Sequence, residues 1–207
     1  RYIHHINDHS VRFWPSNFFH GAKAHIFFDG NDHRIFWIVG AHDDLALIIH
    51  NASAFEPEAD EPAAQLEQFE QFYRVHMAAP FQLNRALAPQ LARQHNASII
   101  HITDIYIHAP APQFAAYVAT KAGAHSLAMS FARELAPEVR VNTIEPGPIL
   151  FLDEHGDAWR QQVLARTPLA REGGLEPIWQ AVTLLMANDY MTGASIRVDG
   201  GRALAVI

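Results

Sequence analysis

The chain has 207 residues, about half of them apolar, which is enough for one compact domain with a substantial core. Its 15 basic residues against 22 acidic ones give a formal charge of −7, so it lacks the positive charge that drives binding to a phosphate backbone, and we expect no nucleic-acid partner. The absence of cysteine excludes disulfides and thiolate metal sites and fits a cytoplasmic protein. Its longest apolar runs are far shorter than the roughly 18 residues of a membrane-spanning helix, so we expect no membrane partner.

Short apolar runs alternate with long helical patterns from residue 45 onward. This alternation is typical of an α/β fold, in which helices cover a parallel sheet. Residues 45–50 predict a strand that ends at Asn51, and residues 63–94 carry apolar side chains at close to helical spacing, which predicts a long helix. Pro80 and Pro89 are expected to kink or split that helix.

The second half of the chain continues the same alternation. Pro146, Gly147 and Pro148 form its clearest break, because proline and glycine end regular structure. The predicted elements are strands at 98–103, 139–144 and 194–198 and helices at 113–136, 157–166 and 177–187.

Tyr117 and Lys121 lie four residues apart on the predicted helix 113–136, so their side chains emerge on one face. A tyrosine hydroxyl ordinarily has a pKa of about 10, and we expect the lysine ammonium to lower the pKa of Tyr117 toward a useful acid strength. Tyr117 is then able to protonate a substrate that has received a hydride. The same spacing arises by chance on amphipathic helices, so on its own it also fits a purely structural role.

Polar residues follow three of the predicted strands. Asn51 ends one strand, Asp104 ends the next and Pro146-Gly147 ends a third. Ligands of open α/β sheets bind at the carboxyl ends of the strands, so we expect these residues to converge on one crevice. Taken singly, each also has a structural interpretation, with Asp104 as a helix or turn cap, Asn51 as a turn former and Phe55 as a core residue under a loop.

In order and spacing, these residues resemble the motifs of the short-chain dehydrogenase/reductase family. The family carries a strand-terminal Asn-Ala-Gly, a serine followed by Tyr-x-x-x-Lys, a later Pro-Gly and a near-terminal Val-Asp-Gly-Gly. The matching segments here are Asn51-Ala52-Ser53, Asp104, Tyr117 to Lys121, Pro146-Gly147 and Val198-Asp199-Gly200-Gly201. The resemblance covers roughly residues 45–204 and implies a Rossmann-like, doubly wound parallel sheet of about seven strands with helices on both faces.

Two departures from the common motifs resemble the pteridine reductase branch of that family. Asp104 replaces the serine, and Asn51-Ala52-Ser53 is followed closely by Phe55. Segments 48–53, 99–104, 130–139 and 149–151 are similar to bacterial dihydromonapterin and dihydrofolate reductases. This resemblance implies an NADPH-dependent reduction of the C=N bond of a dihydropterin or dihydrofolate.

The resemblance also implies roles for individual residues. Tyr117 donates the proton, Lys121 binds the nicotinamide ribose and tunes Tyr117, and Asp104 positions the substrate and shares the proton relay. The implied binding residues are Asn51, Ala52, Pro146, Gly147 and Ile149 for the cofactor and Phe55 for the flat pterin ring, which it contacts by stacking.

His76 falls where the family has a helix asparagine that completes a proton relay. It either serves in the same way or simply packs, and the sequence leaves both interpretations open. Histidine is abundant, with 14 residues, but no histidine or acidic partners recur at ligand spacing, so we expect no metal site.

The first 44 residues depart from the family pattern. The family's glycine-rich phosphate turn falls on residues 5–12, which contain no glycine. Runs 24–28 and 35–39 suit the second and third strands, but the few residues between them are fewer than the roughly 12 of a parallel crossover. We therefore expect residues 1–44 to be an incomplete or incorrectly assigned segment, a hypothesis that an intact mass of 23.2 kDa would exclude. Asp29 in this segment favours NADH, whereas the branch resemblance implies NADPH.

Two other functions remain open at this stage. The first is reduction or oxidation of a carbonyl or alcohol substrate, which the wider family performs. The second is a non-catalytic dinucleotide-sensing or scaffolding protein, which the missing glycine turn would explain. Helices 63–94 and 113–136 carry more apolar positions than one sheet face needs, so we also expect a homo-oligomer, a tetramer or a dimer, which sedimentation tests.

Overall fold

The computed structural model describes residues 27–28, 35–36, 45–151 and 155–205. Within these residues, a four-stranded sheet has the order β3-β4-β5-β6. All neighbouring strands are parallel, with His50 beside His101 and Ile102 beside Ile144, so the carboxyl ends of the strands share one edge. The strands are β3 (Leu47–His50), β4 (Ala97–Ile102), β5 (Val139–Pro146) and β6 (Ser195–Val198).

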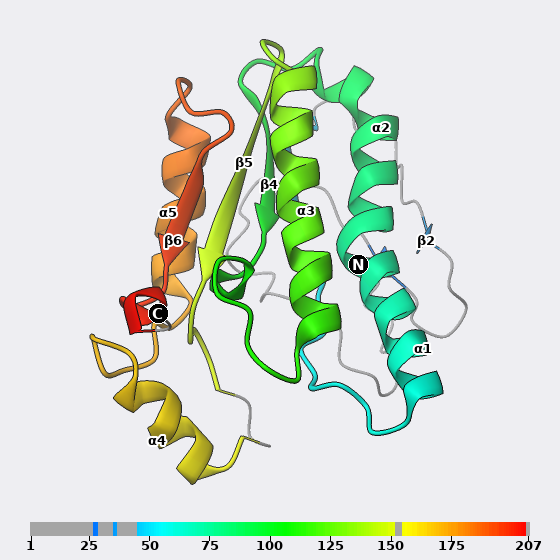
Figure 1. Cartoon of the computed structure of the whole chain (residues 1–207). Helices are drawn as coiled ribbons and strands as arrows, with labels where there is room; N and C mark the ends of the chain where they lie inside the picture. Colours follow the sequence, from blue (N-terminus) through cyan, green and yellow to red (C-terminus); the bar gives the residue numbers. More distant parts are fainter. Residues whose placement is uncertain (1–26, 29–34, 37–44, 152–154, 206–207) are drawn as a thin grey trace, which may run out of the picture.

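Helices cover both faces of this sheet. Figure 1 shows α2 and α3 side by side on one face and α5 on the other, as the family resemblance implied. The helices are α1 (Pro62–Tyr73), the π-helix η2 (Arg74–Ala78), α2 (Ala79–Leu91), the 3-10 helix η3 (Ile105–Ile107), α3 (Ala115–Glu134), α4 (Asp157–Ala165), α5 (Glu176–Ala187) and the 3-10 helix η4 (Arg202–Ala205).

Successive residues of the strands feed two apolar cores, because side chains alternate across a sheet. Ile99 and Val141 pack with apolar residues of α2 and α3. Ile100 and Ile144 pack with residues of α5. The central strands β4 and β5 are therefore buried on both faces, as expected for strands of a parallel sheet covered by helices.

The predicted helix 63–94 is divided by the π-helix η2. There the Ala79 amide donates to the carbonyl of Arg74, one residue further back than in an α-helix. Pro80 lacks an N–H group and cannot bond the carbonyl four residues before it, which favours a wider turn at this point. Pro89 lies inside α2 without ending it, so the prediction that it splits the helix is wrong.

Of the predicted strands 24–28 and 35–39, the structure describes only β1 (Phe27–Phe28) and β2 (Ile35–Phe36). These residues pair with each other in antiparallel fashion and not with the parallel sheet. A short connection can close an antiparallel pair but cannot carry a parallel crossover. The rest of residues 1–44, including 5–12 and Asp29, lies outside the described residues, so the count of about seven strands stays a prediction.

Four large apolar side chains remain exposed along α1 and α2. They are Leu66 (60% exposed), Phe69 (42%), Tyr73 (51%) and Phe81 (41%). Exposed apolar groups of this size are common at contact surfaces. The homo-oligomer expected from the sequence stays a prediction. None of the helices that the structure describes is long and apolar enough to cross a membrane.

Candidate active site

The ends of three parallel strands bring the predicted residues to one edge of the sheet. Asn51 follows β3, Asp104 lies two residues after β4, and Pro146 is the last residue of β5. Helix α3 begins at Ala115, so Tyr117 lies in its first turn, directly above this edge. The described residues confirm that these strand ends share one edge of the sheet, and that they line one crevice stays a prediction.

Asp104 and Tyr117 share a hydrogen bond. The Tyr117 hydroxyl donates to Oδ2 of Asp104 over 2.8 Å, and the backbone amide of Tyr106 donates to Oδ1 over 2.8 Å. Asp104 thereby caps η3, so one carboxylate both orients the tyrosine and starts the turn that follows it. Burial raises the pKa of Asp104 above its usual value, although these two hydrogen bonds oppose the rise.

Tyr117 is almost completely buried and holds its proton tightly. Burial raises the pKa of its hydroxyl well above 10, and the negative charge of Asp104 raises it further. The expectation that Lys121 lowers the pKa of Tyr117 is therefore wrong for this structure. The reason is geometric: Asp104 touches the hydroxyl, whereas the Lys121 Nζ lies 5.8 Å from the centre of the ring. Tyr117 consequently enters any reaction as a proton donor.

Lys121 is buried one turn further along α3. Burial lowers its pKa to about 8, and the negative charge of Asp104 opposes this shift. Its Nζ donates to the carbonyl of Ile102 over 3.1 Å. An ammonium group has three N–H donors, so Lys121 is chemically suited to donate to ligand hydroxyls, such as those of a ribose, as well.

His76 lies under Tyr117 and bridges two hydroxyl side chains. Its Nδ1 is 2.8 Å from Oγ1 of Thr120 and its Nε2 is 3.0 Å from Oγ of Ser53. Thr120 donates its own proton to the carbonyl of Tyr117 over 2.9 Å, so His76 must donate from Nδ1, which leaves Nε2 of the neutral ring as an acceptor facing Ser53. Burial lowers the pKa of His76 to about 2, with a smaller contribution from the charge of Lys121, so its ring is neutral.

A pair of histidines lies beside Lys121, with His101 buried and His50 half-buried. Asn84 links the pair, because its Oδ1 is 2.7 Å from Nε2 of His50 and its Nδ2 is 3.3 Å from Nε2 of His101. Burial lowers the pKa of His50 to about 4, and it lowers that of His101 as well. His50, His76, His101 and Lys121 all line a cavity of about 10 Å³, which is close to the space that one water molecule occupies.

Phe55 lies at the open side of the site. It is 40% exposed, stacks on Phe114 with ring centres 4.7 Å apart, and meets the ring of Tyr117 edge-on at 5.0 Å. The sequence placed Phe55 beside the reacting centre, and the structure brings it into contact with the proton donor. Its partly exposed ring gives this edge of the site a flat apolar surface.

The segment after β5 is held against the end of β6. The Gly147 amide donates to the carbonyl of Val198 over 3.0 Å, and a Cβ atom at Gly147 would lie 2.7 Å from the Cα of Asp199, so only glycine fits. Ile149 follows and lines a cavity of about 490 Å³ together with Arg171 and Arg197. Neither Asp104 nor Tyr117 lines this cavity, which lies along the ends of β5 and β6.

Two polar residues of the site were not assigned from the sequence. Ser53 stands in the Asn51-Ala52-Ser53 motif, and its hydroxyl at the motif's third position was the available signal. Glu145 precedes Pro146 and is 2% exposed, and its signal was an acidic residue at the end of a strand run that leads into the Pro146-Gly147 motif. Both lie within contact distance of histidines, Ser53 of His76 and Glu145 of His108.

Comparison with known proteins shows the family to which the chain belongs. A family model described as Enoyl-(Acyl carrier protein) reductase matches residues 34–203. The chain is 40% identical over 165 residues to the dihydromonapterin reductase of Klebsiella pneumoniae, which aligns 78% of this chain with 68% of that protein. The chain belongs to the short-chain dehydrogenase/reductase family. It is therefore an NAD(P)-dependent oxidoreductase by class, as the sequence motifs predicted.

Solved structures of the same family share the fold. FolM alternative dihydrofolate reductase 1 from Brucella suis, in complex with NADP, has a TM-score of 0.71 and 27% identity, covering 77% of this chain and 64% of that chain. Acetoin dehydrogenase from Enterobacter cloacae has a TM-score of 0.69 and 28% identity, covering 80% of this chain and 67% of that chain. These similarities confirm the Rossmann-like sheet. The chain spans about two thirds of the length of these proteins.

Proposed function

We propose that this protein is an NADPH-dependent reductase of a dihydropterin or dihydrofolate. The observation that carries the proposal is the 2.8 Å hydrogen bond from Tyr117 to Asp104 at the carboxyl edge of the sheet. The relative from Klebsiella is named for a dihydropterin, and the Brucella structure is named for dihydrofolate and contains NADP. Both names support the substrate class and the cofactor proposed here.

The chemistry divides between cofactor and protein. When bound, the reduced nicotinamide supplies the hydride that adds to the carbon of the C=N bond. Tyr117 donates its proton to the nitrogen, and the positive charge of Lys121 compensates the phenolate that forms. Asp104 orients the Tyr117 hydroxyl by accepting its hydrogen bond. After the transfer, a proton taken up from solvent by Asp104, whose pKa burial raises, passes to the Tyr117 phenolate and restores the hydroxyl.

The donor set of the site suits a dinucleotide. Lys121 would donate to the ribose hydroxyls, and Asn51 and Ala52 would line the cofactor channel. Pro146 at the end of β5, with Gly147 and Ile149 after it, would hold the nicotinamide ring. NADPH is the proposed cofactor, and a direct comparison with NADH tests the preference.

His76 has a positioning role in this proposal. Its two ring nitrogens fix the hydroxyls of Ser53 and Thr120, and a hydrogen bond from Ser53 lowers the pKa of Tyr117 against the larger effect of burial. A neutral imidazole with a hydrogen bond at each ring nitrogen keeps Ser53 beside Tyr117, the proton donor. Among the two interpretations of His76, these contacts support a role at the site over simple packing.

A carbonyl substrate is the second candidate. The similarity to the acetoin dehydrogenase structure favours it, because the name of that enzyme denotes a hydroxyketone. The exposed ring of Phe55 beside Tyr117 favours the pterin instead, since a flat heterocycle gains more from stacking than a small ketone does.

The test follows NADPH oxidation by the full-length protein with a dihydropterin, dihydrofolate and a simple ketone. Tyr117→Phe should lower kcat/KM for the pterin by about 10² to 10⁴, the usual contribution of a general acid. Tyr190→Phe is the matched control, because Tyr190 is 98% exposed, and its activity should equal that of the wild type. Ketone turnover about a hundredfold faster than pterin turnover would refute the pterin assignment. No turnover of any substrate would favour a dinucleotide sensor.

A further inference from the structure

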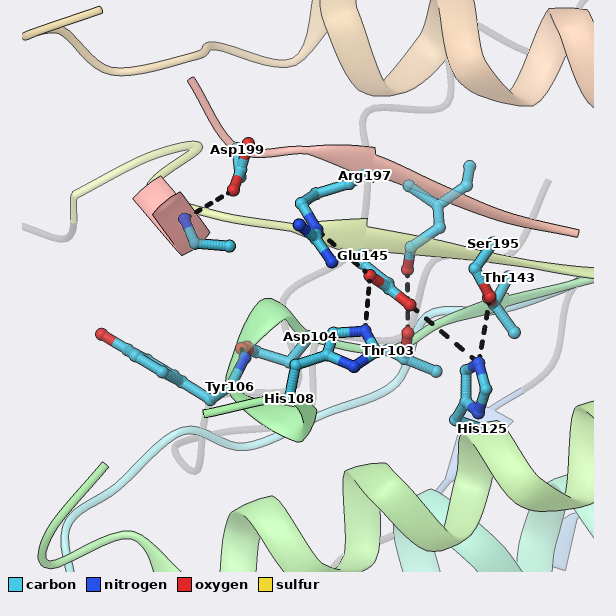
Figure 2. Close-up of polar contacts among 12 residues, drawn as sticks. Thr103, Asp104, Tyr106, His108, His125, Thr143, Glu145, Ser195, Arg197 and Asp199 are labelled. Atoms are coloured by element: carbon cyan, nitrogen blue, oxygen red, sulfur yellow. Dashed lines mark hydrogen bonds and ion pairs between the residues drawn. The ribbon is translucent and has the colours of Figure 1, made fainter. Parts of the chain in front are cut away.

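A carboxylate with several basic partners lies beside the end of η3. Glu145 is on β5, one residue before Pro146, and is 2% exposed. A charged group this deeply buried is costly unless opposite charges and hydrogen bonds compensate it. Figure 2 shows three basic side chains around it: His108 Nε2 at 3.0 Å and Arg197 Nε at 3.5 Å from Oε2, and His125 Nε2 at 4.0 Å from Oε1.

These partners come from three different segments of the chain. His108 directly follows η3, His125 is on α3 and Arg197 is on β6. His125 is held in turn by Ser195, whose Oγ is 3.0 Å from its Nε2. Glu145 therefore joins the strand that leads to Pro146 with three neighbouring elements of the site (Figure 2).

One of these links leads directly to Asp104. The 3-10 helix η3 is a single turn that Asp104 caps at its start and His108 closes at its end. The hydrogen bond from His108 to Glu145 fixes the far end of this turn, while the Tyr106 amide fixes Asp104 at the near end. The orientation of the Asp104 carboxylate toward Tyr117 thus depends on where Glu145 holds the turn.

Glu145 also acts on Asp104 through its charge. The two carboxylates share no hydrogen bond, yet the negative charge of Glu145 raises the pKa of Asp104, as a smaller contribution beside burial. A negative charge at this position makes it harder for Asp104 to lose its proton. The geometry and the electrostatics therefore act on the same carboxylate.

Two simpler roles for Glu145 fit less well. The described residues contain no group of three or more metal-ligating side chains arranged to hold a metal ion, so the cluster is not a metal site. A carboxylate present only to brace the fold would have both oxygens bonded. Here Oε1 is buried without a hydrogen-bond partner among the described residues.

We propose that Glu145 is a positioning residue for proton transfer: through His108 it holds the η3 turn that carries Asp104 against Tyr117. This inference rests on the proposed function, because it assumes that Asp104 and Tyr117 exchange a proton with the substrate. It adds a specific role for a residue outside the reacting pair.

The test is the pH profile of kcat/KM for Glu145→Gln, which removes the charge and keeps the side chain's length. The pH profile has a limb where kcat/KM falls as Asp104 titrates, and this limb is identified as the one that disappears in Asp104→Asn. Without the charge of Glu145, Asp104 loses its proton more readily, so this limb should move to lower pH by on the order of 0.5 unit. The looser turn should lower kcat/KM at the optimum by about tenfold.

Two control variants distinguish the effect of the charge of Glu145 from the effect of its side-chain length. Glu145→Asp keeps the charge on a shorter side chain, so it should restore the position of the limb but not the full rate. Glu138→Gln removes an equal charge from an exposed residue next to the start of β5, and should change neither quantity. A shift of the limb in Glu138→Gln as large as in Glu145→Gln would overturn the proposal.

A double-mutant cycle with His108 tests the link to the η3 turn. His108 is 48% exposed, so His108→Gln should fold even where Glu145→Gln does not, and should by itself lower kcat/KM. Together the two changes should cost less than the product of the single effects, because they break one contact. Additive losses, or an unmoved limb in Glu145→Gln, would refute the inference. Full activity of Asp104→Asn would instead refute the proposed function on which it rests.

Discussion

The two faces of the parallel sheet both bury polar residues, but they use them differently. On the α5 side, Arg140 donates to the backbone carbonyls of Leu185 (2.8 Å), Met191 (3.0 Å) and Met186 (3.4 Å), and Asn142 also donates to Met191 (2.9 Å). Arg140 has one side-chain partner, Oδ1 of Asn96 at 3.0 Å. On the α3 side, several buried polar groups bond other side chains. Examples are Tyr117 with Asp104, His76 with Thr120 and His50 with Asn84.

This difference in partners distinguishes hydrogen bonds that only stabilise the fold from hydrogen bonds that can take part in proton transfer. A backbone carbonyl neither gains nor loses a proton, so the bonds of Arg140 and Asn142 can only hold the C-terminal end of α5 against the sheet. Bonds between titratable side chains change when one partner gains or loses a proton. The α3 face can therefore respond to a substrate, whereas the polar groups of the α5 face serve stability.

The largest effect expected from this comparison is a loss of stability at Arg140. Arg140→Met keeps an apolar stem of similar length but removes every donor, leaving carbonyls near the end of α5 without partners. We expect the free energy of unfolding to fall by about 2 to 4 kcal/mol. Urea unfolding measures this loss, and kcat/KM of the remaining folded protein at low temperature should match the wild type.

Arg140→Lys is the matched variant for that experiment. Lysine keeps the positive charge but cannot form the fork of donors that reaches several carbonyls at once. Its stability should lie between those of Arg140→Met and the wild type. A large drop in kcat/KM with unchanged stability, for either variant, would contradict the division between the two faces.

A second expected effect concerns pH on the α3 face. Because burial lowers the pKa of Lys121 to about 8, its ammonium is charged below pH 8 and increasingly neutral above it. A neutral lysine cannot compensate the phenolate of Tyr117, so kcat/KM should fall by about tenfold for each pH unit above this pKa. Tyr117 itself does not cause this decline, since its own pKa lies well above 10.

Lys121→Arg checks the origin of the alkaline decline. Arginine stays protonated through this range, so the decline near pH 8 should disappear, although the different shape of the guanidinium should lower the rate at the optimum. A decline at an unchanged pH in Lys121→Arg would show that another group titrates there.

The sequence predicted the site as far as strand order and helical spacing reach. The strands that precede Asn51 and Asp104 read as buried apolar runs, and parallel strands place their carboxyl ends at one edge, so the convergence followed from local patterns. The direction of the pKa shift of Tyr117 did not follow, because it depends on a contact with Asp104 and on burial rather than on the spacing to Lys121. The sequence did not predict the contacts of Glu145 either, because they join residues that are distant in sequence.

The backbone also has features that the sequence pattern predicted and features that it did not. Helical periodicity predicted the span of α1 and α2, but it could not indicate the π-helix between them. That turn depends on Pro80 and on the side chains that His76 meets across the interface with α3. The parallel assignment of runs 24–28 and 35–39 was wrong because apolar composition sets burial and not strand direction, which the short connection decides.

The smallest expected effect is at Arg85, an arginine that serves as a counterpart to Arg140. Arg85 is on α2 and pairs with Glu134 of α3, and both side chains are about half exposed. Its guanidinium also lies 5.3 Å and 5.1 Å from the ring centres of Phe81 and Phe131. Exposed ion pairs and exposed cation–π contacts each contribute only about 0.5 to 1 kcal/mol, and salt weakens the ionic part.

Arg85→Gln should therefore lower the free energy of unfolding by about 1 kcal/mol or less in low salt, and by less in about 1 M salt, where ionic interactions are screened over a few ångströms. Its pH profile of kcat/KM should match the wild type, because its partner Glu134 is exposed and does not contact the reacting pair. Urea unfolding of Arg85→Gln and Arg140→Met under identical conditions makes the comparison direct. A loss at Arg85 as large as that at Arg140 would mean that the charge of an arginine, rather than its buried backbone partners, sets its contribution to the stability of this fold.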